Sequence, residues 1–68
     1  MNVIKGTSTW LLIFSADDRG RVANALAKAK IVFVAAKGGD VNGVVLTIVE
    51  IDQSKYQEAE ITAALAGM

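Results

Sequence analysis

The sequence has no cysteine, no histidine and no proline, and only four of its 68 residues are aromatic. Without cysteine there is no disulfide, and without histidine a zinc site loses one of its usual ligands. General acid–base catalysis loses its most common side chain. The scarcity of aromatic rings disfavours nucleic acid, because single-stranded bases stack on such rings. We therefore predict a protein that is not an enzyme and that has no metal and no cofactor.

The length of the chain permits a single small domain, residues 1–68, with marginal burial. A mass of 7.2 kDa buries about 60% of the surface that the unfolded chain exposes. Small domains without disulfides or metals often gain stability by oligomerisation, and the 53% apolar content fits that route. No apolar run approaches the ~20 residues of a membrane span. We expect a cytoplasmic homo-oligomer that does not enter the membrane.

Charge is unevenly placed although the net charge is zero. Residues 1–37 carry six basic and two acidic residues, whereas residues 38–68 carry one basic and five acidic residues. One interpretation is a basic face for an anionic partner, with Arg19 and Arg21 as candidate anion contacts. The other interpretation, which we favour, is that the two halves lie side by side and neutralise each other.

Three segments are apolar on both faces: residues 10–14, 31–36 and 44–49. A strand with one buried face alternates apolar and polar residues, and these segments barely alternate. They predict strands over residues 7–15, from residue 31, and over residues 44–51. The first six residues form either a loose arm or a short strand.

Two amphipathic segments predict helices. Ser15 followed by Asp18 approximates a capping box at the start of a helix over residues 17–30, and Ser54 starts a second helix in the same way. The apolar stripes are Val22, Ala25, Leu26 and Ala29, then Ile61, Ala64, Leu65 and Met68. The predicted fold class is α+β with the order β-α-β-β-α: a three-stranded sheet with two helices packed on one face. The alternative places the second helix on the opposite face.

The turn between the last two strands decides which side chains share a face. An Asn42-Gly43 turn sets Val41 opposite Val44, and a competing Gly38-Gly39 turn sets residue 37 opposite residue 40. In both registers even residues of the second strand face odd residues of the third, unless a bulge at the glycines breaks the parity. With the bulkier set under the helices, the open face becomes a predicted protein interface. Its residues are Leu11, Ile13, Val32, Val34, Val45, Thr47 and Val49.

Asp18-Arg19-Gly20 after a strand, then Val22 to Leu26 and Ile31, resembles the opening of ACT-type regulatory domains over about 35 residues. That resemblance implies amino-acid binding at a dimer interface. The chain lacks the proline usual before the glycine and the closing fourth strand.

The absence of a catalytic constellation and the surplus of apolar sheet surface together predict the class of function. We expect a non-enzymatic protein–protein interaction module that self-associates, binds a larger protein complex as an inhibitor or accessory subunit, or does both. Short chains of this kind are often encoded by phages or mobile elements, so a viral source is part of the hypothesis. The alternatives are a small-ligand-binding regulatory module of ACT-like type and, less favoured, a nucleic-acid-binding protein.

Overall fold

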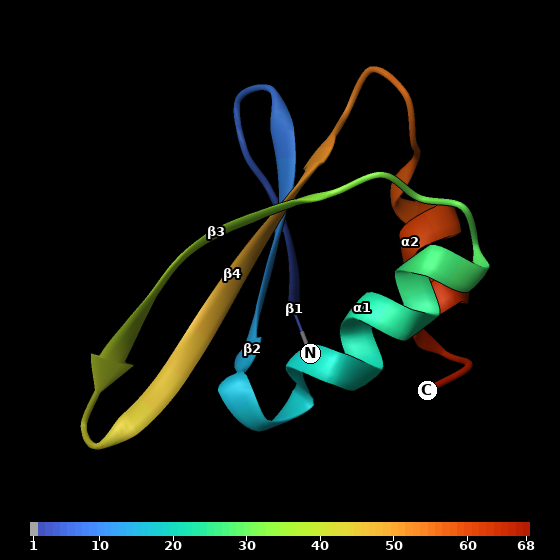
Figure 1. The fold of residues 1–68 in the computed structure, drawn as a ribbon. Coiled ribbons are helices and arrows are strands. Elements are labelled where there is room, and N and C mark those ends of the chain that lie inside the picture. The colour runs from blue at the N-terminus through green and yellow to red at the C-terminus, as the bar shows by residue number, and fades with distance from the viewer. Residues whose placement is uncertain (1) are drawn as a thin grey trace.

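The structure, a computed structural model, describes residues 2–68, with side chains for all of these except residues 2 and 35–37. Figure 1 shows a small α+β fold in which one antiparallel sheet carries two helices. The strands are β1 (Asn2–Lys5), β2 (Thr9–Ser15), β3 (Val34–Val41) and β4 (Val44–Asp52). A 3₁₀ turn, η1 (Ala16–Asp18), leads into helix α1 (Arg19–Lys28), and helix α2 is Glu58–Leu65.

The sheet has four strands in the order β1-β2-β4-β3, so the prediction of three strands is one strand short. The additional strand is β1, which pairs with β2 between Lys5↔Trp10 and Asn2↔Ile13. The sequence left this segment open between an arm and a strand. Strand β2 begins at Thr9, later than predicted, because the N–H of Gly6 donates to the carbonyl of Thr9 (2.9 Å) in the preceding turn.

The turn between β3 and β4 is Asn42-Gly43. The φ angles of these two residues are 52° and 80°. Two consecutive positive φ angles are typical of a type I′ turn, which matches the twist of a hairpin. Val41 pairs with Val44, as this turn predicts. The competing pair, Gly38-Gly39, lies inside β3 instead.

A β-bulge at those glycines reverses the predicted parity. Ala36 pairs with Ile48 and Gly39 with Leu46, so two residues of β3 oppose one residue of β4. A Cβ on Gly38 would clash with the carbonyl oxygen of Leu46, so the close approach at the bulge requires glycine. From Val34 to Ala36, before the bulge, even residues of β3 face even residues of β4. The predicted pairing of even with odd residues is wrong over this stretch.

Helix α1 is shorter than the predicted 17–30 because both ends take other conformations. The hydroxyl of Ser15 accepts from the N–H of Asp17 (3.4 Å) at the start of η1. At the other end Lys30 has a φ of 59°, its N–H donates to Ala27 and that of Ile31 to Leu26. These two bonds form a Schellman motif, which ends the helix and delays the start of β3 to Val34.

Helix α2 begins at Glu58, not near Ser54, and the predicted start is wrong. The carbonyl of Tyr56 accepts a 2.9 Å hydrogen bond from the indole N–H of Trp10, so it is engaged outside any helix. Ser54 instead donates through its N–H and its hydroxyl to Asp52. The helix start is set by Glu60, whose carboxylate accepts from the N–H of Gln57 (3.1 Å).

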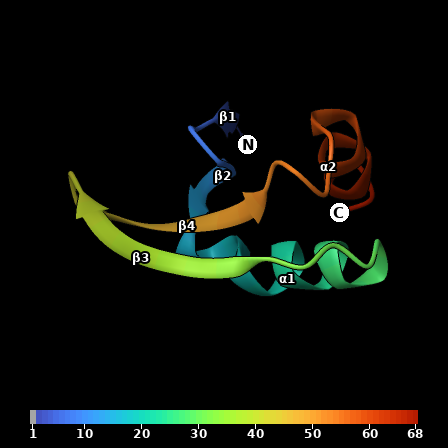
Figure 2. The same ribbon diagram turned by 90° about the horizontal axis from the view of Figure 1, so that it is seen from above.

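Both helices pack on the same side of the sheet, as predicted. Figures 1 and 2 show them gathered on one side, with the β3–β4 hairpin extending away from them. Among the residues that the structure describes, Val22 and Leu26 of α1 and Ile61 of α2 are buried in one cluster with apolar residues of β2 and β4. We call this side of the sheet the inner face. Its residues in β2 and β4 are Trp10, Leu12, Phe14, Thr47, Val49 and Ile51.

Candidate protein-interaction face

The opposite side of the sheet, the outer face, carries no helix from the described residues 2–68. Cross-strand pairing places eight aliphatic side chains from all four strands on it. These residues are Ile4, Leu11, Ile13, Val34, Val41, Val44, Leu46 and Ile48. Four of them are exposed by 42% or more, and the other four have intermediate exposure. Glu50 is the one charged residue of β4 between residues 44 and 51, and its carboxylate lies 3.5 Å from the hydroxyl of Thr9.

Some predicted interface residues lie where the sequence placed them. Leu11 and Ile13 of β2 and Val34 of β3 are on the outer face. Val32 is 69% exposed but lies in the connection before β3, where its N–H donates to the hydroxyl of Tyr56 (3.0 Å). These placements leave the interface role itself as a prediction.

The predicted positions in β4 are a correction. Thr47 and Val49 were expected on the open face, but they are 2% and 3% exposed beneath the helices. Val45 shares their side of β4 yet is 55% exposed, because it lies beyond the end of β2, whose last pair is Ser15↔Leu46. The physical reason is the bulge, which shifts the pairing of β3 with β4 by one residue. Because of this shift Val34 pairs with Glu50, so the even residues of β4, and not the odd ones, share its side of the sheet.

The same reversal brings onto the outer face residues that the sequence reasoning missed. Val44, Leu46 and Ile48 belong to the bulkier set that the predicted register placed under the helices, and Val41 was not assigned to the interface. A sequence signal for this existed: Gly38-Gly39 lies only two residues before the Asn42-Gly43 turn, and two turns cannot both close one hairpin. A glycine inside a strand pattern is typical of a bulge.

One end of the outer face is polar. A hollow of about 410 Å³ lies there, lined by Ser8, Thr9, Val32, Val34, Glu50, Asp52, Lys55 and Tyr56. The pKa of Asp52 is lowered, mainly because the hydroxyl and the N–H of Ser54 donate to its carboxylate, with a smaller contribution from the charge of Lys55. This end therefore keeps its charges in water, while the rest of the face is aliphatic.

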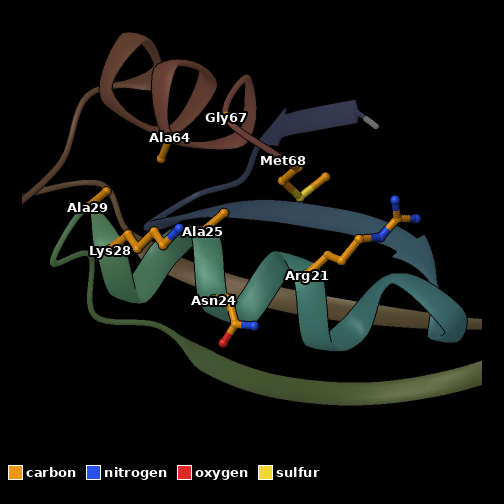
Figure 3. Close-up of a pocket in the computed structure, with 8 residues that line it drawn as sticks. All are labelled: Arg21, Asn24, Ala25, Lys28, Ala29, Ala64, Gly67 and Met68. Carbon is orange, nitrogen blue, oxygen red and sulfur yellow. The ribbon is translucent and has the colours of Figure 1, made fainter.

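A second concave site lies between the two helices. It is a groove of about 400 Å³. Figure 3 shows Ala25 of α1 on one side of it and Ala64 of α2 on the other. Arg21 and Lys28 stand on its α1 side, and Met68 lies at the end of the chain beyond α2. The groove is shallow and apolar at its base, with cations at its margin.

The structure places the two candidate anion contacts apart. Arg21 is ion-paired with Asp18 and lines the groove, so part of its charge is already compensated. Arg19 is exposed at the first position of α1. Two residues apart on a helix, their side chains point in directions about 160° apart.

The described residues offer little other chemistry. Within residues 2–68, no group of three or more acidic side chains is arranged to hold a metal ion. All four aromatic residues belong to the core or pack against it, and Tyr56 also lines the hollow at the polar end of the outer face. No helix of this described part is long and apolar enough to cross a bilayer.

Comparisons of the chain with protein-family models, with curated proteins and with solved structures find no match.

Proposed function

We propose that this chain is a non-enzymatic protein–protein interaction module that acts through its outer face. It self-associates, binds a larger protein complex as an inhibitor or accessory subunit, or does both. The observation that supports this proposal is the continuous aliphatic surface formed by Ile13, Leu46, Ile48 and their neighbours on the side of the sheet without helices. Exposed apolar patches of a few hundred Å² mark association sites in soluble proteins.

The charge distribution favours a protein partner over a nucleic acid. Glu50 and Asp52 are acidic and the other outer-face side chains of the described strands are uncharged, so these strands offer no cations to phosphates on this face. Its aliphatic β-branched and leucine side chains fit another apolar protein surface.

Photo-cross-linking tests this function. A photoreactive amino acid is introduced at Ile48 on the outer face or, as the matched control, at Thr62, which is exposed on α2. We expect irradiation in cells that express the chain to give a covalent protein adduct from position 48 and none from position 62. Equal yields at the two positions, or no adduct from either, would contradict the outer face as the contact surface.

A small-ligand-binding role of ACT-like type is the second candidate, and the groove between α1 and α2 is the observation that favours it. Its cationic margin at Arg21 and Lys28 suits the carboxylate of an amino acid. A rise in melting temperature with free amino acids that disappears in Lys28→Glu would support this candidate. No shift with any amino acid would count against it.

A further inference from the structure

We propose that the partner of the outer face is a second copy of this chain, in a two-fold symmetric dimer. In that dimer the tips of the β3–β4 hairpins reach onto the partner copy. This inference rests on the proposed function and names its partner. Four observations carry it: the bulge, the hairpin tip, the surface area of the monomer and the lack of charge on the face away from its polar end.

The bulge determines which side chain of the distal part of β3 is on the outer face. Because Gly39 pairs with Leu46 after the register shift, Val41 stands on the outer face beside Val44 and Asp40 pairs with Val45 on the other side. If the register at Ala36↔Ile48 continued without the bulge, Asp40 would stand on the outer face instead. The bulge therefore keeps the face aliphatic up to its end, which matters only if that end is desolvated.

The hairpin tip, residues 40–45, extends beyond the end of β2 and is a two-stranded ribbon. Figure 2 shows it projecting away from the helices. Three valines of the tip are exposed by 54%, 50% and 55%: Val41 and Val44 on the outer face and Val45 on the opposite side. A two-stranded ribbon is marginal in water. Valines on both of its sides indicate that another surface covers the tip.

The space beside the tip is suited to such a covering. A hollow of about 330 Å³ lies between the tip and η1, lined by Ser15, Ala16, Asp17, Gly43, Val44 and Val45. A partner that occupies this hollow reaches Val45, whereas a partner restricted to the outer face does not. Contact on both sides of the tip is therefore the distinctive feature of the proposed dimer.

The surface area of the monomer favours a partner that is always present. The chain exposes 4570 Å², against about 4,100 Å² expected for a compact monomer of 7.2 kDa. It has no disulfide to offset this deficit. An accessory subunit that binds its partner only transiently would leave this extra surface exposed to water for most of the time. A second copy is available wherever the chain is made.

The area of the outer face shows why the tips are needed. The four strands present a plan area of roughly 440 Å² per face, so two copies bury roughly 900 Å². Standard interfaces bury about 1,200 Å² or more in total. That plan area counts only the outer side of each tip, so contact on the opposite side, at Val45 and the hollow beside it, adds buried area in both copies of an isologous dimer. Away from the polar end that holds Glu50 and Asp52, the outer face carries no charge and packs against its own copy without like-charge repulsion.

Sedimentation equilibrium of the full chain tests the dimer. We expect the wild-type mass to rise with concentration to twice 7.2 kDa. Val41→Thr with Val44→Thr, and separately Val45→Thr, keep the shape and the strand preference of the tip but add hydroxyls. We expect the dimer Kd to rise about tenfold for each buried valine. Ala27→Ser with Ala63→Ser adds the same groups to exposed helix positions and should leave Kd unchanged.

The outcomes separate the dimer from the broader function. A wild-type chain that stays monomeric up to millimolar concentration overturns the dimer. In that case an Ile48 cross-link to a different protein still supports the interaction module, and the absence of any cross-link overturns both. A dimer weakened by the Val41 and Val44 changes but not by Val45→Thr overturns the contact on both sides of the tip. Far-UV circular dichroism of each variant confirms that the fold is retained.

Discussion

The two faces of the sheet are both apolar, but they differ in the shape of their side chains. The inner face contains Trp10 and Phe14 and packs against the helix residues Val22, Leu26 and Ile61. Away from its polar end, the outer face is built from valine, leucine and isoleucine, and no helix within residues 2–68 covers it. Hydrophobicity alone therefore does not reveal which face of a small sheet is covered. The two helices have enough apolar side chains for one face, and the bulky residues lie where those helices pack.

The largest expected effect comes from charging one face and then the other at adjacent positions of β4. Val49→Glu places a carboxylate on a residue that is 3% exposed on the inner face. Burying an unpaired charge costs several kcal/mol, which approaches the ~5–15 kcal/mol of a typical domain. We expect this variant to be unfolded by circular dichroism, while Ile48→Glu on the outer face keeps the native spectrum. The reverse result would mean that the faces are assigned the wrong way round.

The second effect compares the two helices that cover the inner face. Leu26 of α1 is fully buried, whereas Leu65 of α2 is only partly buried. Truncating a buried leucine typically costs about 2–5 kcal/mol. We expect Leu26→Ala to lower the free energy of unfolding in urea by that amount and Leu65→Ala to lower it by less. An equal loss in both variants would show that α2 covers the inner face as fully as α1 does.

The third effect concerns the bulge that keeps the two faces distinct. Gly38→Ala places a Cβ against the backbone of Leu46, where nothing flexible can move away. Overpacking of this kind costs typically about 1–3 kcal/mol. Gly39→Ala is the matched control, since a Cβ there meets nothing within 4 Å. We expect urea titrations to show a clear loss for Gly38→Ala and a much smaller change for the control.

These contrasts also show how far the sequence could predict the molecule. Apolar runs and helical stripes were enough for the α+β class, for both helices and for the inward side of β2, because those signals are local. The inward side of β4 was predicted wrongly, because parity depends on one extra residue in β3 that no periodicity in β4 reveals. The start of α2 was also missed, because a tertiary hydrogen bond from Trp10 to the carbonyl of Tyr56 competes with the local capping signal at Ser54.

The predictions for the candidate site divide in the same way, into those that rest on local signals and those that depend on strand pairing. Leu11, Ile13 and Val34 were placed on the outer face by alternation within their own strands. Leu46 and Ile48 depended on how β4 pairs with β3, and the bulge changed that pairing. The existence of an open face was predictable from the ratio of apolar sheet surface to helices. The residues that form it required the register.

The smallest expected effect lies at the polar end of the outer face, where Asp52 pairs with Thr9 across the strands. The pKa of Asp52 is lowered in the fold, first by the hydroxyl of Ser54 and then by its N–H. The unfolded chain therefore binds this proton more readily than the folded chain. The stability that the carboxylate contributes is present above its unfolded pKa of about 3.9 and is lost as the pH falls through the lower folded value.

Urea unfolding of wild type and Asp52→Asn at neutral pH and below pH ~3 should show a difference in the free energy of unfolding that shrinks on acidification. Because the hydroxyl of Ser54 is the main cause, Ser54→Ala should make that difference less dependent on pH. An unchanged pH dependence in Ser54→Ala would show that this hydrogen bond does not hold the carboxylate in its charged form.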